Sequence, residues 1–170
     1  MSNSTASRIT LKNFSSMESL SEETLCFTAT VFVDGKLLAA ASNHGHGGST
    51  SIGPTIGGPD FNEIRIIEAL FAATLPSVMF EGFELKGSLE SVVDDIANRM
   101  HFEKGVKSEL RSKVLAQDPA TKKLYMWSRK HKGQNVTDRL YALIAEKNPA
   151  YIVLNKLPIS EAADLYSASK

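Results

Sequence analysis

The sequence is poor in cysteine, in net charge and in long apolar runs. It contains one cysteine, Cys26, so no disulfide can form within the chain and we expect a reducing compartment. The 19 basic residues balance the 19 acidic residues, which disfavours attraction of the whole chain to nucleic acid or to an anionic membrane. No stretch approaches the roughly 20 apolar residues of a membrane span, and the N-terminus lacks the apolar core of a signal peptide. These absences predict a cytoplasmic protein without a membrane partner.

The composition that remains is that of an ordinary globular protein. The chain has 170 residues, of which 42% are hydrophobic and 22% are charged. A chain of this length is expected to form one domain with a core large enough to need no disulfide or metal. Residues 1–7 are small and polar and are predicted to be a disordered tail, so the predicted domain spans residues 8–170.

The N-terminal third alternates apolar and polar residues and is predicted to form strands. The alternation covers residues 8–14, expected at a sheet edge, and residues 24–33. Asp34-Gly35 follows, a dipeptide typical of two-residue hairpin turns in which both residues have positive φ. Residues 36–42 are then expected to return as a strand, and residues 43–59 to form a long loop without secondary structure.

The rest of the chain predicts helices with one more hairpin. Helices are expected over residues 61–74, from residue 89 until Gly105 ends or kinks the helix, over 137–147 and over 159–166. Their predicted N-caps are Asp60 with Glu63, Ser88 with Ser91, and Thr137. Residues 76–87 are expected to form an irregular connection, and residues 129–135 a basic loop. A hairpin is expected over 112–117 and 122–128, and a short strand over 151–154. This order predicts an α+β fold, with an antiparallel sheet packed against three to four helices.

The periodicity of the helices also predicts which of their residues are buried and which are exposed. The apolar face of the first helix is expected to be Phe61, Ile64, Ile67, Leu70, Phe71 and Thr74. Asp94 and Asp95 on the second helix are expected to be exposed to solvent.

The candidate site is the segment from Asn43 to Thr50, which we call the glycine loop: Asn43, His44, Gly45, His46, Gly47, Gly48, Ser49 and Thr50. One interpretation is a ligand site, in which the amides of the three glycines point at one phosphate, with help from the two hydroxyl residues. The spacing matches neither the Walker loop nor the dinucleotide-binding fingerprint. The alternative is a turn that needs glycine for backbone reasons alone.

The two histidines of the glycine loop allow two other kinds of chemistry. His44 or His46 is a weak candidate for a general base, because an unperturbed imidazole titrates near pH 6.5. Together they could bind zinc if Asp60, Glu63 or His101 supplied a third ligand. No motif supplies that ligand at a diagnostic spacing, so neither a metal nor a cofactor is predicted.

A basic segment is the weaker second candidate. Cations alternate with Tyr125 and Trp127 there, a pattern that can bind a nucleic acid backbone and stack on its bases. The favoured alternative is a solvated hairpin whose two aromatic residues face the core. The basic residues of the segment are Lys122, Lys123, Arg129, Lys130, His131 and Lys132.

Two blocks of the sequence resemble a family of small proteins encoded by bacteriophages, prophages and plasmids. The first block is residues 21–36, SEETLCFTATVFVDGK, and the second is Asn43-x-Gly45-x-Gly47-Gly48. His44 and His46 depart from the family pattern, which more often has an acidic or amide residue and an arginine or histidine there. The family is uncharacterised, so the resemblance implies a mobile-element origin and an accessory role and supplies no catalytic residues.

The functional prediction is therefore an accessory protein that acts by binding in the host cytoplasm. The expected partner is a host protein or a nucleotide-like small molecule held by the glycine loop, and counter-defence is one version of that role. The alternatives are a small hydrolase or transferase using His44 or His46, and a nucleic-acid-binding protein using residues 122–132. Whether the chain forms a homo-oligomer stays open.

Overall fold

The computed structural model describes residues 8–75, 78–80, 83–85 and 87–169, and it has the predicted α+β architecture. The chain divides into two compact units, residues 1–99 and residues 100–170, and each is described here by itself. The single domain expected from the chain length stays a prediction. Within the described part of the chain, no helix is both long enough and apolar enough to cross a membrane.

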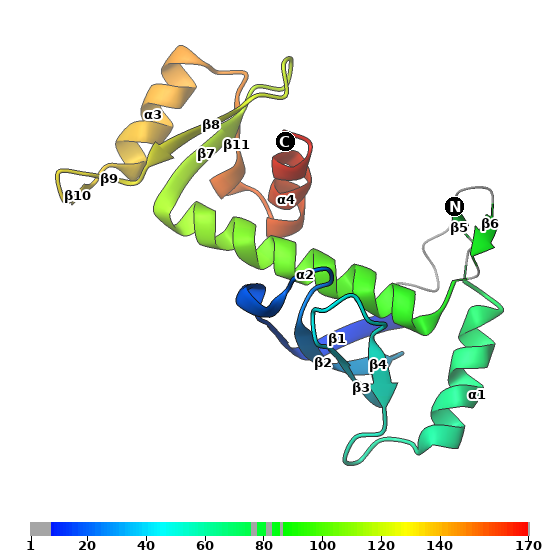
Figure 1. The fold of residues 1–170 in the computed structure, drawn as a ribbon. Coiled ribbons are helices and arrows are strands. Elements are labelled where there is room, and N and C mark those ends of the chain that lie inside the picture. The colour runs from blue at the N-terminus through cyan, green and yellow to red at the C-terminus, as the bar shows by residue number, and fades with distance from the viewer. Residues whose placement is uncertain (1–7, 76–77, 81–82, 86, 170) are drawn as a thin grey trace. The chain divides into compact units, whose positions relative to one another are not determined.

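The first unit is built on a four-stranded antiparallel sheet (Figure 1). Its strands are β1 (Ile9–Ser16), β2 (Phe27–Val33), β3 (Lys36–Asn43) and β4 (Ser51–Gly53), and they lie in that order. The first three confirm the predicted strands, and β1 is at the edge as expected. The short β4 pairs with β3. The long loop predicted for residues 43–59 is therefore wrong in part, because a strand interrupts it.

The hairpin between β2 and β3 follows from its sequence. Asp34 and Gly35 have φ values of 50° and 77°, the left-handed geometry that this two-residue turn requires. Val31 pairs with Leu11 on one side and with Ala39 on the other, and all three side chains are buried. The alternation of β2 therefore directs one set of its side chains into the core.

Helix α1 (Phe61–Ala72) begins where predicted. The Asp60 carboxylate accepts the backbone N–H groups of Asn62 and Glu63 at 2.9 and 3.0 Å. Of the predicted apolar face, only Ile64 and Phe71 are buried. Phe61 and Leu70 are 63% and 65% exposed, so that part of the prediction is wrong. The strands β5 (Val78–Phe80) and β6 (Phe83–Leu85) follow as an antiparallel pair, in a segment predicted to be irregular.

Helix α2 (Leu89–Ser112) crosses the boundary between the units. At its start, Ser88 and Ser91 exchange hydrogen bonds between their side chains and backbone amides, both 3.1 Å long, as the predicted cap requires. Gly105 does not end the helix, which continues to Ser112, so that alternative of the prediction is wrong. A single glycine inside a helix costs only about 1 kcal/mol relative to alanine, and the adjacent Val106 is buried.

The second unit has a three-stranded antiparallel sheet with β7 (Lys113–Gln117) in the middle, between β8 (Leu124–Ser128) and β11 (Ile152–Val153). Val114 and Ala116 pack with Ile144 of α3 (Thr137–Lys147). Leu115 points to the other face and packs with Ala162 of α4 (Ile159–Ser167) and with Leu154 of a short 3-10 helix (Leu154–Lys156). The helices thus cover both faces of β7, which confirms the predicted hairpin, strand and helices.

Two predictions for the segment before α3 are wrong. Residues 129–135 do not form a simple loop, because β9 (Lys130–His131) pairs with β10 (Gln134–Asn135) as a second hairpin. Thr137 does not cap α3 but is its first residue. The N-cap position is Val136, whose side chain makes no cap hydrogen bond, and the Oδ1 atom of Asn135 just before it accepts the Thr137 N–H at 2.9 Å.

Candidate functional site

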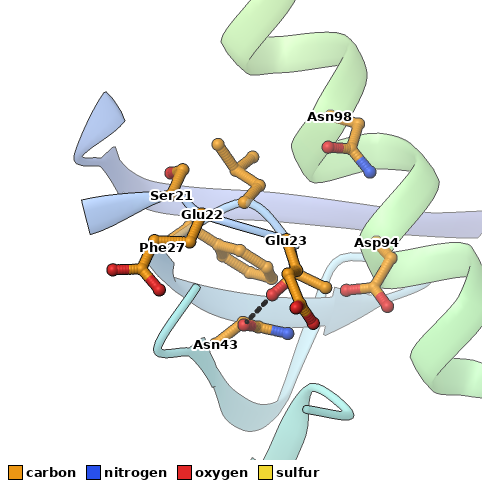
Figure 2. Close-up of a pocket in the computed structure, with 9 residues that line it drawn as sticks. Ser21, Glu22, Glu23, Phe27, Asn43, Asp94 and Asn98 are labelled. Carbon is orange, nitrogen blue, oxygen red and sulfur yellow. Dashed lines mark hydrogen bonds between the residues drawn. The ribbon is translucent and has the colours of Figure 1, made fainter. Parts of the chain in front are cut away.

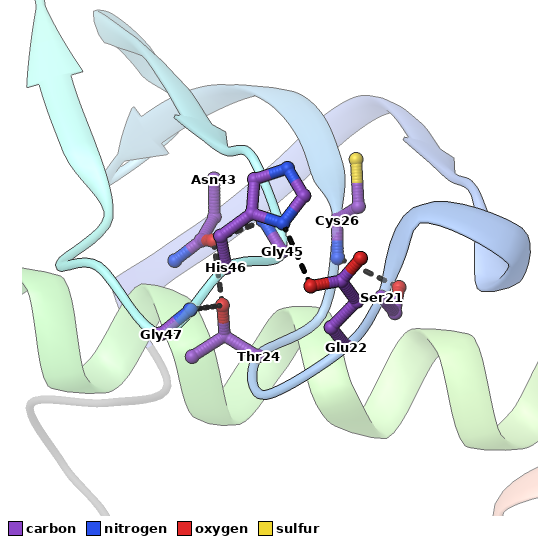
Figure 3. Close-up of polar contacts among 8 residues, drawn as sticks. All are labelled: Ser21, Glu22, Thr24, Cys26, Asn43, Gly45, His46 and Gly47. Carbon is purple, nitrogen blue, oxygen red and sulfur yellow. Dashed lines mark hydrogen bonds and ion pairs between the residues drawn. The ribbon is translucent and has the colours of Figure 1, made fainter.

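Asn43 organises the glycine loop through four hydrogen bonds, of which Figure 3 shows those to Thr24 and Gly45. Its side-chain oxygen accepts the Thr24 hydroxyl and the Gly45 N–H, both at 2.8 Å. Its side-chain nitrogen donates to the Gly48 carbonyl at 2.9 Å and to the Thr50 hydroxyl at 3.1 Å. Asn43 is only 6% exposed, and its bonds to the Gly45 N–H and the Thr50 hydroxyl are buried, whereas those to Thr24 and Gly48 are partly buried. The amide that ends β3 therefore fixes the loop that follows it.

The Gly45 carbonyl joins the glycine loop to the turn that precedes β2. It accepts the backbone N–H groups of Glu22, Glu23 and Thr24 at 2.9, 3.0 and 3.3 Å. Gly45 has a φ of 88°, and a Cβ atom there would overlap the backbone carbonyl of Leu20. Glycine is needed at this position both for its backbone geometry and for its lack of a side chain. The two blocks that carry the family resemblance are thus in direct contact.

Two of the amides proposed to hold a phosphate already donate to side chains of the first unit. The Gly45 N–H donates to Asn43, and the Gly47 N–H donates to the Thr24 hydroxyl at 3.3 Å. Ser49 is exposed, whereas Thr50 is 1% exposed and donates its hydroxyl proton to Asp94 of α2. The loop geometry thus gives two of the three glycine amides an acceptor within the chain. This favours the alternative in which glycine serves the backbone.

A pocket of about 400 Å³ lies beside the glycine loop, within the first unit (Figure 2). It is formed by the turn before β2, the end of β3 and one side of α2. Its lining includes the apolar residues Leu25 and Phe27. We call it the turn pocket, and its lining residues are Ser21, Glu22, Glu23, Thr24, Leu25, Phe27, Asn43, Asp94 and Asn98.

The charge of the turn pocket has one sign. Among the residues that the structure describes, its ionisable lining residues are the three carboxylates of Glu22, Glu23 and Asp94, and none is basic. Opposite charges attract and like charges repel most strongly where water is partly excluded. The pocket is therefore suited to a positively charged group and poorly suited to a phosphate.

The two histidines are on the solvent side of the loop. The strand β3 ends at Asn43, so His44 and His46 lie in the loop beyond it and share no strand face. His46 Nδ1 lies 3.2 Å from a Glu22 carboxylate oxygen, and the two side chains are 63% and 71% exposed (Figure 3). His44 is exposed. In the described segments, no three His, Cys, Asp or Glu residues are grouped closely enough to hold a metal ion. The third ligands suggested by the sequence are thus not brought together with the histidines.

The basic segment is split by the structure into two groups of residues. Lys122 and Lys123 are in the turn before β8, and Lys130 and Lys132 are in the hairpin after it. Arg129 is part of neither group. Its guanidinium donates to the Thr137 hydroxyl at 3.0 Å and to the Leu110 carbonyl at 3.2 Å near the end of α2. This arginine therefore stabilises the fold at the base of the hairpin.

The aromatic residues of the basic segment pack within the unit. Trp127 and Tyr151 contact the cluster of Val114, Ala116 and Ile144. Tyr125 stacks between them, with ring centroids 6.1 Å from Trp127 and 5.2 Å from Tyr151. A hydrogen bond with Tyr125, helped by desolvation, raises the pKa of Tyr151 to about 12. The faces of these rings are occupied by one another, as the core-facing alternative predicted.

Sequence reasoning missed the role of Asp94. It was expected to be solvent-exposed together with Asp95, but it is half-buried and bonded to Thr50, whereas Asp95 is exposed as predicted. A signal was present in the helix pattern, because Asp94 lies next to the buried stripe of Leu89, Val93 and Ala97. A carboxylate at the border of such a stripe is placed to meet a neighbouring element.

Comparison with known proteins gives no relative for this chain. No family model matches it, no curated protein is significantly similar to it, and no solved structure matches its fold. The functional argument therefore depends on the geometry of the site.

Proposed function

We propose that this chain is an accessory binding protein of a mobile element, and that its turn pocket binds a lysine or arginine side chain of a host protein. The observation that carries the proposal is a preformed pocket of about 400 Å³ whose ionisable lining residues are all carboxylates. The mobile-element origin is supported by the sequence resemblance of residues 21–50. Modulation of a host system, including counter-defence, is the biological role that such binding would serve.

The turn pocket is preformed, because hydrogen bonds hold each of its walls in place. Its turn is held by the Gly45 carbonyl, its loop by Asn43, and its helix by the Thr50–Asp94 hydrogen bond. A rigid site loses less entropy on binding than one that has to be ordered. Leu25 and Phe27 offer apolar surface along which the methylene stem of a lysine or arginine can pack.

A nucleotide-like ligand is the weaker version of the proposal. Three carboxylates would repel its phosphates, and the amides of Gly45 and Gly47 already have acceptors. A host protein is therefore the preferred partner of the two predicted from the sequence.

The proposal can be tested with the smallest fragments of such a partner. N-acetyl-arginine amide and N-acetyl-lysine amide would be titrated into ¹⁵N-labelled protein and followed by NMR. We expect a Kd on the order of 1 mM, typical of a contact worth roughly 4 kcal/mol, with the largest shifts at Glu23, Thr24 and Asn98. Glu23→Gln should weaken binding at least about threefold, which corresponds to the loss of roughly 0.7 kcal/mol of charge attraction.

Glu18→Gln is the matched control, because Glu18 is exposed, precedes the same turn and does not line the pocket. It should bind both compounds as the wild type does. Binding of ATP at these residues, with no shift from either cationic compound, would overturn the proposal in favour of the phosphate version. No shift from any of the three compounds would remove the pocket as a binding site.

One observation favours a second candidate, a small hydrolase or transferase. His46 meets Glu22 at 3.2 Å, and a carboxylate can orient an imidazole that acts as a general base. The pair is exposed and His46 is not among the lining residues of the pocket, which makes this the weaker candidate. A hydrolytic activity found by substrate screening and retained in full by a His44→Ala/His46→Ala double variant would exclude both histidines from the chemistry.

A further inference from the structure

The neutral net charge of the chain conceals a strong division. Residues 1–99 contain 6 basic and 12 acidic residues, whereas residues 100–170 contain 13 basic and 7 acidic residues. The first unit is thus net negative by six charges and the second net positive by six. The neutrality that disfavoured nucleic acid applies to the whole chain and not to the second unit. A unit with this excess of cations attracts polyanions.

Within the second unit, the hairpin formed by β9 and β10 has the composition of a binding ribbon. We call residues 128–135, SRKHKGQN, the basic ribbon; they include no apolar side chain. Lys132 and Gly133 form its two-residue turn with φ values of 48° and 81°. Every residue from 130 to 135 is exposed. An isolated two-stranded hairpin is only marginally stable in water. Because the side chains of this hairpin are exposed, they do not stabilise the fold by burial.

The side chains of the ribbon tip are available to a partner. For Lys130, Lys132 and Gln134, no side-chain hydrogen bond or ion pair is formed with any other residue that the structure describes. The two ammonium groups are therefore not neutralised by a nearby carboxylate. An amide side chain next to them adds both a donor and an acceptor, the pair of groups that reads a base edge.

The base of the ribbon is held firmly. Arg129 bonds to the end of α2 and to Thr137, as described above, and its backbone pairs with Ser112 and Val136 at 3.0 and 2.9 Å. The Asn135 side chain accepts both the N–H and the hydroxyl of Thr137. The tip thus projects from an anchored base, which reduces the entropy lost when it binds.

We propose that the basic ribbon binds double-stranded DNA, with its tip in the major groove. That groove is wide enough for a two-stranded β-ribbon, and its rim of phosphates would be met by Lys130 and Lys132. An acidic protein surface fits less well, because the ribbon offers none of the aromatic or aliphatic anchors that dominate protein interfaces. A membrane surface fits less well for the same reason, since interfacial binding needs an apolar face to insert.

This proposal differs from base stacking on the aromatic residues of the same segment. Tyr125, Trp127 and Tyr151 stack on one another and on the core, so the proposed contact uses cations and the ribbon shape alone. It is also independent of the turn pocket, which lies in the other unit.

The test is fluorescence anisotropy of the full chain with three labelled nucleic acids: a 20-base-pair DNA duplex, one of its strands alone, and duplex RNA of equal length. Phosphatidylserine vesicles are then added as a competitor of the bound DNA duplex. We expect preference for duplex DNA, with an affinity that falls steeply between 50 and 200 mM salt. Lys130→Glu/Lys132→Glu should weaken binding at least tenfold. The slope of log affinity against log salt should decrease by about two, because each phosphate contact contributes about 0.9.

The matched control is Lys104→Glu/Lys107→Glu, which makes the same charge change at exposed positions of α2 in the same unit. It should retain affinity within about threefold, and circular dichroism should show that both double variants are folded. Equal losses in the two variants would overturn the ribbon as the binding element. Absence of binding at 50 mM salt, stronger binding of single strands or duplex RNA, or complete displacement by vesicles would overturn duplex DNA as its partner.

Discussion

The glycine loop and the basic ribbon are both polar, but their polar groups are used in opposite ways. Both are short polar segments with glycine at positive φ, and both were candidate sites on the sequence. In the glycine loop, polar groups are bonded to one another around Asn43, which is 6% exposed. In the basic ribbon, Lys130, Lys132 and Gln134 are exposed and have no such partners among the described residues.

This difference shows how a polar loop can be assigned a role. A loop whose donors and acceptors are satisfied internally acts as structure, and its function is carried by the surface it builds, here the turn pocket. A loop whose polar groups are exposed, and whose base is held by other residues, is available for a partner. The comparison makes quantitative predictions, which follow from the largest expected effect to the smallest.

The largest difference is expected between two glycines with nearly the same φ. Gly45 has a φ of 88° and Gly133 a φ of 81°, but a Cβ atom overlaps the Leu20 carbonyl at Gly45 and meets nothing within 4 Å at Gly133. Left-handed geometry costs an alanine about 1–2 kcal/mol, and overpacking adds about 1–3 kcal/mol. Gly45→Ala should therefore lower the free energy of unfolding by about 3 kcal/mol or more, and Gly133→Ala by about 1 kcal/mol.

Urea unfolding followed by circular dichroism measures both values. Gly48→Ala serves as the control for the loop, because Gly48 has neither a positive φ nor a neighbour within 4 Å of the added Cβ. Its stability should match that of the wild type within about 0.5 kcal/mol. Equal losses for Gly45→Ala and Gly133→Ala would contradict the contrast between the two loops.

The next effect concerns the hub of the glycine loop. Asn43→Ala removes the partner of the Thr24 hydroxyl, the Gly45 N–H and the Gly48 carbonyl. An unsatisfied buried polar group costs about 1–3 kcal/mol, so we expect a loss of about 2–3 kcal/mol. His44→Ala, at the adjacent exposed position, should cost less than about 0.5 kcal/mol in the same unfolding assay. Equal stability of the two variants would show that the hydrogen-bonded loop does not form.

A smaller effect of opposite sign is expected in the helix that crosses the unit boundary. Gly105 is inside α2, is exposed, lacks a positive φ, and has open space where a Cβ would lie. Gly105→Ala should therefore raise the free energy of unfolding by about 0.5–1 kcal/mol through helix propensity alone. A decrease in stability would mean that α2 is interrupted at this glycine, as the sequence pattern first indicated. The same unfolding curves would also show whether the two units unfold in one transition, as the predicted single domain requires.

The features that could be predicted from the sequence are those determined by neighbouring residues. Asp34-Gly35 specifies its turn because the two residues themselves adopt positive φ. Asp60 and Ser88 specify helix starts because their partners are two or three residues away. The apolar alternation of β2 likewise needs only the strand itself to define its buried face.

The turn pocket could not be predicted, because its contacts join residues far apart in the chain. Thr50 and Asp94 are separated by 44 positions, and nothing local to either residue indicates the other. The Gly45 carbonyl accepts amides of the turn before β2, and both β2 and β3 separate that turn from Gly45 in the chain. The glycines were recognised as important, but whether they served a ligand or the backbone depended on which groups they met after folding.

The smallest effect tests whether the aromatic residues beside the basic ribbon are occupied within the unit. Hydrogen bonding with Tyr125, with a contribution from desolvation, raises the pKa of Tyr151 to about 12, above the ordinary tyrosine value of about 10. Because the folded-state pKa is raised, this contribution to stability is present below pH 10 and is lost as the pH rises towards 12. Ultraviolet difference titration should show one of the four tyrosines ionising last. Tyr125→Phe should move that last ionisation towards pH 10, whereas Tyr141→Phe should leave it unchanged. A titration in which every tyrosine ionises near pH 10 would contradict the stacked arrangement. The rings would then be free to stack on nucleic acid bases.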